Sequence, residues 1–510
     1  MYKFAILIGI YSYAIFLLGV LGELNKPKLL ILTLVFAILS LVLVKVPKNI
    51  IGKILKRNLG LGKFEKIVLL LIAVQVAVNF IGVLGPELSF DALWYHLTLP
   101  KIYLASGEIL HIPGGLLYYS DMPKLVEMLY IASLSQGSEI IAKALHFLFG
   151  LGSLIALYAL SKKFLSTRLS LFVVLVFYSN LVIGWLSITS YIDLGRVFFE
   201  ILTLYYFSEY IKKGKISILY ISAVLLGLAI STKLIAVSSL LIYIPLILLY
   251  KKDIKGSILF TLISLLVPAP WFIFSYINTG NPIYPFLTNI YQVSPSFNLG
   301  NVINFIRSSD PISPIYLIFL PLLVYNFKKI NSVYKLFAYY SLLAFIIWLV
   351  TPQSGGGRFI AAYLPAFSLA IVLAVSKSNK KYQFLFYVFA VIVCVVSIGY
   401  RGVANLKYIP VILGAQTKSE FLSKNLNFDY GDFYDVDGYF EKKFNKGDRV
   451  LVYGIHNLYY VNFPYIHESY LKKGDFYNYV LVRGDVPQIV MGQKPIYTNE
   501  RTHVKLYRVQ

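Results

Sequence analysis

Long apolar stretches recur along most of the chain, and short polar segments separate them. A helix needs about 20 predominantly apolar residues to cross a bilayer core, and several stretches reach or approach that length. The pattern therefore predicts a mostly α, polytopic helical membrane protein. We predict about thirteen transmembrane helices, at residues 4–22, 29–46, 66–84, 141–160, 169–186, 191–211, 216–232, 234–250, 257–277, 312–327, 336–351, 359–376 and 382–400.

The division of residues 216–250 rests on length. This apolar stretch has 35 residues and is interrupted only by Ser231, Thr232 and Lys233. A single helix of that size would be about 52 Å long, which is more than one crossing requires. We therefore expect a tight hairpin of two short spans that turns at Lys233.

Basic residues gather in every second loop, which sets the orientation. Seven lie between residues 45 and 66, and three lie in each of five later loops, at 162–168, 212–215, 251–255, 328–335 and 377–381. The intervening loops have no such cluster. Because cytoplasmic loops carry an excess of Lys and Arg, we predict a cytoplasmic N-terminus and an external chain after residue 400. The protein is then a multi-pass protein of the cell membrane.

Composition excludes several classes of protein. Hydrophobic residues make up 58% of the chain and charged residues 14%, whereas soluble domains have about 25% charged residues. An ordinary soluble enzyme, a disordered protein and a fibrous protein are therefore excluded. The net charge of +23 would suggest nucleic-acid binding in a soluble protein, but here the basic loops account for it and we expect no nucleic-acid partner.

The chain divides into two predicted domains. Residues 1–400 form a transmembrane domain with large external loops at about 85–140 and 278–311, and residues 401–510 form a small external α/β domain. In this second domain, short helices are expected within 415–426 and 455–475. Its Val- and Tyr-rich segments, bounded by Gly and Asp, indicate strands at 449–454, 479–484, 495–499 and 503–509.

The first external loop contains the first candidate chemistry. Asp91 opens an amphipathic segment that we expect to lie along the membrane interface, and 120–134 indicates a second interfacial helix. Asp91 is either a helix N-cap or, beside Tyr95 and His96, a general base for an external hydroxyl group. His96 and His111 are either metal ligands or simply hydrogen-bonded.

Three further ionisable residues lie at the predicted external face. Asp193, at the mouth of the sixth span, is either functional or paired with Arg196, three residues further along the same helix. Lys233 and Arg358 are isolated cations at the face whose membrane loops have no basic cluster. They either anchor the chain at the headgroups or bind a lipid phosphate. We expect the two carboxylates and the two cations to serve one site.

An aromatic segment overlaps the end of the ninth span and continues into the long external loop. Residues 268–286 read PAPWFIFSYINTGNPIYPF, in which Pro and Gly favour tight turns. The aromatic rings, including that of Tyr284, suit a sugar or a prenyl chain. The alternative is an aromatic belt at the membrane interface.

Five motifs in order resemble the GT-C superfamily of polytopic membrane glycosyltransferases. They are FDALWYHLTLPKIY with Asp91, SYIDLG with Asp193, GLAISTK ending at Lys233, PWFIFSYINTGNPIYPF at 270–286, and GGGRFIAAYLPAF with Arg358. The most similar members are protein O-mannosyltransferases of the family 39 type and lipid A aminoarabinose transferases. The tail lacks the WWDYG motif of oligosaccharyltransferases, and the PWFIFSY segment lacks a basic residue that is common there.

The resemblance implies a GT-C-like fold and a set of roles. Asp91 would be the catalytic base and Asp193 the second catalytic acid, while Lys233 and Arg358 would bind the donor phosphate. The substrate pocket would include Tyr95, His96, Arg196 and Tyr284. No cofactor is implied with certainty, and a divalent metal ion, if there is one, would be held by Asp91, Asp193 and His96.

The expected activity is that of an inverting hexosyl- or pentosyltransferase. It would move a sugar from a polyprenyl-phosphate donor to a hydroxyl group of a protein, glycan or lipid acceptor at the extracytoplasmic face of the membrane. One alternative is a lipid-linked glycan polymerase or ligase that uses a diphosphate-linked donor. Another is a flippase or transporter for lipid-linked glycans, although transporter folds often show internal repeats and none is evident in this sequence.

Overall fold

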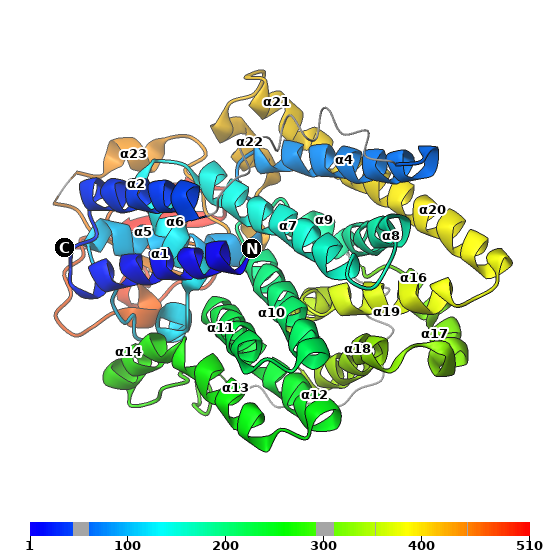
Figure 1. Cartoon of the computed structure of the whole chain (residues 1–510). Coiled ribbons are helices and arrows are strands. Elements are labelled where there is room, and N and C mark those ends of the chain that lie inside the picture. The colour runs from blue at the N-terminus through cyan, green and yellow to red at the C-terminus, as the bar shows by residue number, and fades with distance from the viewer. Residues whose placement is uncertain (44–60, 292–310, 352, 446, 510) are drawn as a thin grey trace.

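The chain forms a bundle of helices with one small sheet near its C-terminus (Figure 1). A computed structural model describes residues 1–43, 61–291, 311–351, 353–445 and 447–509. Most of the first basic loop and most of the predicted external loop 278–311 lie outside the described residues. The helices are α1 (Tyr2–Val20), α2 (Lys26–Leu43), α4 (Lys63–Val83), α5 (Thr98–Ser106), α6 (Leu125–Ser135), α7 (Glu139–Ser161), α8 (Thr167–Tyr178), α9 (Leu181–Leu186), α10 (Asp193–Lys213), α11 (Ile216–Thr232), α12 (Leu240–Lys251), α13 (Ile254–Leu266), α14 (Ala269–Thr279), α16 (Ile315–Ile318), α17 (Leu320–Asn326), α18 (Ser332–Val350), α19 (Leu364–Ser376), α20 (Lys380–Asn405), α21 (Ile409–Ile412), α22 (Lys418–Asn425) and α23 (Tyr439–Lys443).

The predicted fold class is confirmed, but the count of thirteen spans is not. Within the described ranges, seven helices are long and apolar enough to cross a membrane, and the bent pair α13 and α14 makes up to eight. Several predicted spans are broken by residues that end helices. Pro268 precedes the 59° bend between α13 and α14, and Pro321 opens α17 after a break from α16. At the end of α8, the Asn180 side chain donates to the carbonyls of Val176 and Phe177.

The predicted break at Lys233 is present. Helix α11 ends at Thr232, and Lys233 has an extended backbone with φ −150° and ψ 116°. A 3₁₀ turn, Leu234–Ser239, then leads into α12. The break places the Lys233 side chain at a helix end, where its ammonium group is free to reach neighbouring elements.

Helix α10 lies at the centre of the bundle. It packs against α7 and α11, and its residues from Asp193 to Leu204 are all buried. Helix α6 is also an interior element, because ten of its eleven residues are buried among α1, α2, α5, α7 and α11. The predicted interfacial helix at 120–134 is therefore wrong in its placement, since its apolar residues occur on all sides of the helix and not on one face.

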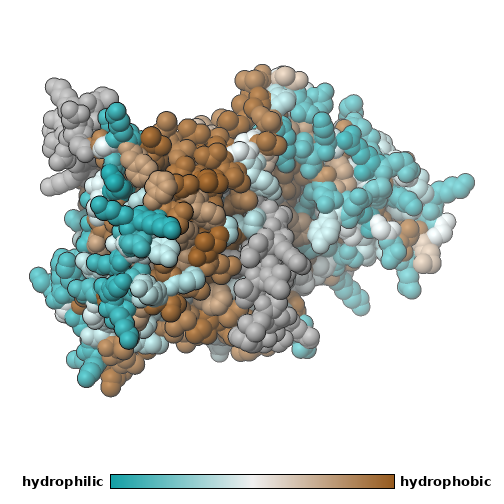
Figure 2. All heavy atoms as spheres, turned by 90° about the vertical axis from the view of Figure 1, so that its right-hand side faces the viewer, coloured by the Kyte–Doolittle hydropathy of each residue, from teal (hydrophilic) through white to brown (hydrophobic). Residues whose placement is uncertain are grey.

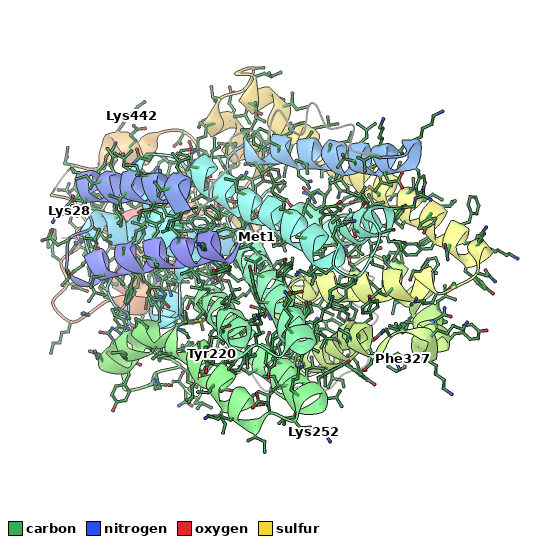
Figure 3. The ribbon with its side chains drawn as sticks, in the orientation of Figure 1. Met1, Lys28, Tyr220, Lys252, Phe327 and Lys442 are labelled. Atoms are coloured by element: carbon green, nitrogen blue, oxygen red, sulfur yellow. The ribbon has the colours of Figure 1, made fainter. Side chains whose placement is uncertain are left out.

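The surface has an apolar band between two hydrophilic ends (Figure 2). Exposed aliphatic and aromatic residues are frequent on α2, α4 and α20, as a lipid-facing surface requires. Glu209 joins two of the basic loops, because its carboxylate is 2.6 Å from the Lys163 Nζ and 2.5 Å from the Lys213 Nζ. Lys252, labelled in Figure 3, marks the end of α12. The assignment of these loops to the cytoplasmic side stays a prediction.

The C-terminal sheet has five strands in the order β2-β1-β3-β5-β4. Strand β1 is parallel to β2 and β3, whereas β5 is antiparallel to β3 and β4. Four strands lie where the sequence predicts them, and α22 lies within the predicted helix 415–426. The fifth, β2, lies in 455–475, where we expected a helix, because three residues are too few to show a strand pattern. The strands are β1 (Val450–Tyr453), β2 (Tyr465–His467), β3 (Tyr479–Arg483), β4 (Tyr497–Asn499) and β5 (Val504–Arg508).

The sheet region packs directly on the first predicted external loop. The Tyr460 hydroxyl donates to the Glu87 carbonyl at 3.0 Å, and the Tyr459 N–H donates to the Leu93 carbonyl at 3.2 Å. Lys101 of α5 donates to two carbonyls of the tail and to the Asn462 side chain, at 2.7 to 2.9 Å. Helix α20 also runs unbroken to Asn405, past the predicted boundary at 400. The two-domain division stays a prediction.

Replacing Lys101 with methionine is expected to loosen this contact. The change removes the donor of three hydrogen bonds, to acceptors on Tyr459, Val461 and Asn462. We expect the free energy of local opening to fall by about 1–3 kcal/mol. Hydrogen exchange of the backbone amides at 459–461 measures it, with the exposed Lys494→Met as the control. Equal protection in the two variants would contradict the prediction.

Candidate active site

Two buried charged residues hold the start of the first external loop. The Lys143 ammonium of α7 donates to the carbonyls of Gly82 and Gly85 at 2.8 and 2.7 Å. The Glu87 carboxylate accepts from the N–H groups of Leu88 and Ser89 on one oxygen and from the Ser190 N–H on the other. Glu87 thereby ties the loop that carries Asp91 to the segment that precedes Asp193.

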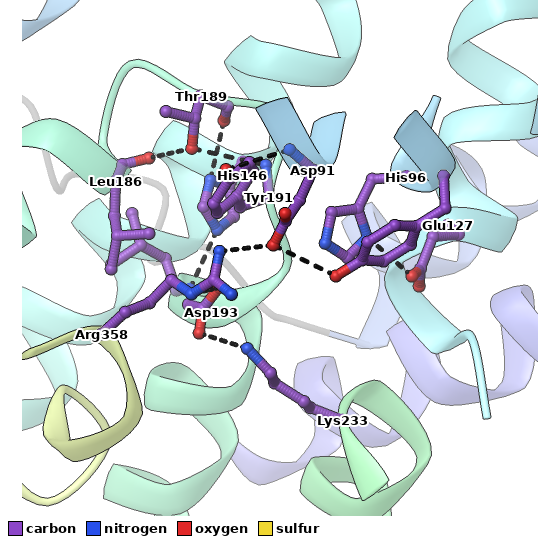
Figure 4. A network of polar contacts seen from close by, with 12 residues as sticks. Asp91, His96, Glu127, His146, Leu186, Thr189, Tyr191, Asp193, Lys233 and Arg358 are labelled. Carbon is purple, nitrogen blue, oxygen red and sulfur yellow. Dashed lines mark hydrogen bonds and ion pairs between the residues drawn. The ribbon is translucent and has the colours of Figure 1, made fainter. Parts of the chain in front are cut away.

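The Asp91 side chain enters a charge cluster and does not cap a helix. Asp91 immediately precedes a π-helical turn, Ala92–His96, but makes no capping hydrogen bond. Its Oδ2 instead accepts from the Arg358 Nη1 at 2.6 Å and from the Tyr95 hydroxyl at 3.3 Å. Its N–H donates to the Tyr191 hydroxyl at 3.1 Å. Of the two readings left open for Asp91, the N-cap is wrong (Figure 4).

Asp193 is the second carboxylate of this cluster. Its Oδ1 accepts from the Lys233 Nζ at 2.7 Å, and its Oδ2 lies 3.9 Å from the Arg358 Nε. The predicted alternative pair with Arg196 is wrong. Arg196 lies nearly one turn deeper in α10, where it is 3.6 Å from the Glu200 carboxylate and donates to the Tyr363 hydroxyl at 2.8 Å.

The four charges therefore come together from four separate segments. Asp91 lies in the first loop, Asp193 begins α10, Lys233 follows α11, and Arg358 lies in the 3₁₀ segment Gln353–Ile360. None of these side chains is more than 16% exposed. Buried charges are costly unless they are paired, and here two anions balance two cations. The expectation that these four residues meet at one place is met by the structure.

The electrostatic environment keeps Asp91 ionised. Burial alone would raise the pKa of its carboxyl group. The Arg358 guanidinium, assisted by His96 and Lys233, more than offsets burial, so the pKa of Asp91 lies below its ordinary value. The Arg358 guanidinium in turn lies over the Tyr191 ring, 4.7 Å from its centre.

Of the predicted pocket residues, one contacts the charge cluster directly, and the others contact residues outside it. Tyr95 contacts Asp91 and stacks on Tyr119 with ring centres 3.7 Å apart. His96 is turned to the Glu127 carboxylate, with its Nδ1 2.9 Å from the Oε1. Tyr284 lies further away, with its ring 6.3 Å from that of His111. Their roles as pocket residues stay predictions.

The site residues do not form a metal centre. Among the residues that the structure describes, no group of three or more His, Cys, Asp or Glu side chains is arranged to hold a metal ion. The oxygens of Asp91 and Asp193 face Arg358 and Lys233, and His96 faces Glu127. His111 is likewise hydrogen-bonded, 2.7 Å from the Asp121 carboxylate.

The sequence reasoning missed His146, Glu87 and Lys143. The Nε2 of His146 accepts from the Leu194 N–H at 2.9 Å, and its Nδ1 lies 2.8 Å from the Thr189 carbonyl. The ring thus binds a free N–H at the start of α10 and so positions Asp193. A signal existed, because Lys143 and His146 are polar residues inside an otherwise apolar predicted span.

Comparisons with known proteins found a family match over part of the chain and solved structures of similar fold. The family described as dolichyl-phosphate-mannose-protein mannosyltransferase matches residues 128–274. No curated protein matches the chain. The crystal structure of ArnT from Cupriavidus metallidurans bound to undecaprenyl phosphate matches with a TM-score of 0.59 at 13% identity, over 78% of this chain and 85% of that chain. Its apo structure matches with the same TM-score at 12% identity.

A weaker match is the oligosaccharyltransferase of Archaeoglobus fulgidus, with a TM-score of 0.44 at 12% identity over 77% of this chain and 63% of that chain. The ArnT match shows the fold of this chain, and the family match covers α10 and α11 with Asp193 and Lys233. The resemblance that the sequence predicts is therefore confirmed, and the protein is a multi-span membrane protein with the GT-C glycosyltransferase fold.

Proposed function

We propose that this protein is an inverting glycosyltransferase that moves a sugar from a polyprenyl-phosphate donor to an acceptor hydroxyl group at the extracytoplasmic face of the membrane. The observation that carries the proposal is the buried cluster of Asp91, Asp193, Lys233 and Arg358. It offers a carboxylate for an incoming hydroxyl group and two cations for a leaving phosphate. The ArnT crystal structure, which has the same fold, holds undecaprenyl phosphate, a lipid of this class.

In the proposed reaction, Asp91 is the general base. Because its pKa is below the ordinary value, Asp91 is ionised at neutral pH and can accept the proton of the acceptor hydroxyl group. The acceptor oxygen forms a bond to the anomeric carbon as the bond from that carbon to the phosphate oxygen breaks. The bonding electron pair leaves with the lipid phosphate, and a single displacement of this kind inverts the anomeric centre.

Lys233 and Arg358 would stabilise the charge that grows on the leaving phosphate. Arg358 is well suited to this task because its planar guanidinium can bind two phosphate oxygens at once. In the free protein it is held by Asp91 at 2.6 Å. A phosphate near Arg358 would compete for that bond and leave the Asp91 carboxylate available to the acceptor. Asp193 would position Lys233, from which it is 2.7 Å away.

Donor cleavage tests the proposal. The purified chain in lipid nanodiscs is given polyprenyl-phosphate monosaccharides and, separately, diphosphate-linked oligosaccharides. We expect slow release of free sugar from a monophosphate donor even without an acceptor, as water replaces the hydroxyl group. Cleavage of diphosphate-linked donors alone would instead favour a polymerase or ligase. Absence of cleavage, with transport of a lipid-linked glycan across the bilayer, would overturn the proposal.

Replacing Lys233 with methionine is expected to lower kcat/KM for the donor by about 100- to 1,000-fold, because one of the two phosphate-stabilising cations is lost. Methionine keeps most of the side-chain length and removes the charge. The matched control is Lys255→Met on α13, where the lysine is exposed. Donor titration of both variants gives kcat and KM separately. A value of kcat/KM within threefold of the wild type would refute the role of Lys233.

A further inference from the structure

A cavity lies outside the charge cluster, in the C-terminal sheet region. Its volume is about 620 Å³, which is within the range of about 300–1,000 Å³ typical of small-molecule sites. Five side chains with hydrogen-bonding groups line it: Asp429, Tyr430, His456, Arg483 and His503. Its remaining lining residues are glycines, and no aliphatic side chain is among them.

The cavity forms where two parallel strands end. β1 ends at Tyr453 and β3 at Arg483, and both are followed by a glycine with positive φ, Gly454 at 68° and Gly484 at 83°. A Cβ on Gly454 would lie 2.0 Å from the Arg483 carbonyl oxygen, so only glycine fits. The chain continues from β1 to β2 on one side, while β3 lies on the other. Ligands of open α/β sheets bind at such switch points, outside the carboxyl ends of the strands.

The cavity contains a cation without a close partner. Within the described part of the chain, the half-buried Arg483 guanidinium makes no close ion pair, although the carboxylates of Asp429 and Asp432 act on its charge. The Asp429 carboxylate is 3.1 Å from the His503 Nε2 instead. Beside them, the Tyr430 ring is 73% exposed. A partly desolvated cation and an open aromatic face are features that a ligand would satisfy.

The cavity adjoins the segment that carries Asp91. The His456 ring of the cavity stacks on Phe90 with centres 5.1 Å apart and contacts the Trp94 ring at 4.3 Å. The Tyr430 ring lies 5.8 Å from that of Phe90. Phe90 and Trp94 flank Asp91 in the chain, so the cavity lies against the same short segment as the proposed base.

We propose that this cavity binds the acceptor of the transfer reaction and that the acceptor is a neutral glycan. The inference rests on the proposed function. Sugar hydroxyl groups both donate and accept hydrogen bonds, which matches a lining of carboxylate, imidazole and guanidinium groups. Tyr430 would cover one sugar face. The carboxylates of Asp429 and Asp432 both act on the charge of Arg483, which disfavours an anionic ligand. The lack of aliphatic lining disfavours a lipid chain or an apolar peptide side chain.

Direct binding tests this proposal separately from catalysis. The full chain with Asp91→Asn, which cannot turn over a bound acceptor, is placed in nanodiscs on an array of neutral oligosaccharides of two to four units. Serine- and threonine-rich peptides and phosphatidylglycerol vesicles are tested beside them. We expect binding to neutral oligosaccharides, weakened at least tenfold by Tyr430→Ala and by Arg483→Gln. The control is Phe476→Ala, which removes another exposed aromatic ring of the tail, one that does not line the cavity.

Each result has a distinct meaning. Binding only to peptides or vesicles, binding to nothing, or equal binding by the wild-type cavity and both cavity variants would overturn the proposal. Loss of glycan binding in Tyr430→Ala and Arg483→Gln, with Phe476→Ala unaffected, would support it. Cleavage of the donor by the chain with Asp91 intact is measured separately. If glycans bind at the cavity and no donor is cleaved, the transferase proposal fails while the glycan site stands.

Discussion

Replacing Asp91 with asparagine is expected to slow sugar transfer by about 100- to 10,000-fold. The amide has nearly the shape of the carboxylate but cannot accept the acceptor's proton. The Arg358 guanidinium loses its 2.6 Å carboxylate partner in the same variant, and its freedom to bind donor phosphate should increase. We therefore expect kcat to fall strongly, while KM for the donor stays constant or decreases. Initial rates at varied donor concentration measure both quantities.

The control for this variant is Glu108→Gln, an exposed carboxylate in the same predicted external loop. It changes charge by the same amount and should transfer at the wild-type rate. A rate of Asp91→Asn within a factor of three of that control, in protein of normal helical content, would contradict the assignment of the base. A fall in both variants would point to the net charge of the loop and not to Asp91.

Replacing Arg358 with methionine is expected to have the second large effect, on rate and on pH dependence together. The rate should fall by about 100- to 1,000-fold, because a cation that faces the leaving phosphate is lost. The guanidinium also lowers the pKa of Asp91 in the wild type. Without it, burial raises that pKa, and only His96 and Lys233 remain to lower it. The acid limb of the profile of kcat/KM against pH should therefore move to higher pH, by about 1–3 pH units.

The direction in which the acid limb moves distinguishes a direct role of Arg358 from damage to the fold. A variant that is only partly folded loses activity at every pH and keeps the wild-type profile. Arg168→Met is the matched control, because it also removes an arginine from an ion pair, 2.8 Å from the Glu65 carboxylate, but away from the site. Its profile should coincide with that of the wild type. An Arg358→Met profile with an unmoved acid limb would separate Arg358 from the base.

The Arg358→Lys variant refines the same prediction. Lysine keeps the positive charge near Asp91, so the acid limb should stay close to its wild-type position. It cannot reproduce the planar fork that reaches both Asp91 and Asp193. The rate should therefore fall between those of the wild type and Arg358→Met, which separates the contribution of charge from that of geometry.

Much of the site was predictable because its signals are local in the chain. Asp91, Asp193, Lys233 and Arg358 each stand out as ionisable residues at the predicted external ends of apolar stretches, where charge is costly. The break at Lys233 follows from counting residues against the thickness of a bilayer. Glu87, Lys143 and His146 were not predicted, because each forms hydrogen bonds with backbone groups of a segment far away in the chain. The sequence around each residue does not indicate which segment it contacts.

The sequence by itself determined the helical membrane class, four of the five strands of the sheet, and the residues of the charge cluster, because hydropathy and charge act through short stretches of chain. Only the tertiary structure decided which charges pair. Asp193 forms ion pairs with Lys233 and Arg358, whereas Arg196 pairs with Glu200, one turn further along α10. The tertiary structure also places the tail against the segment around Asp91. These ion pairs and contacts depend on how segments far apart in the chain pack together. The sequence of a single segment does not determine that packing.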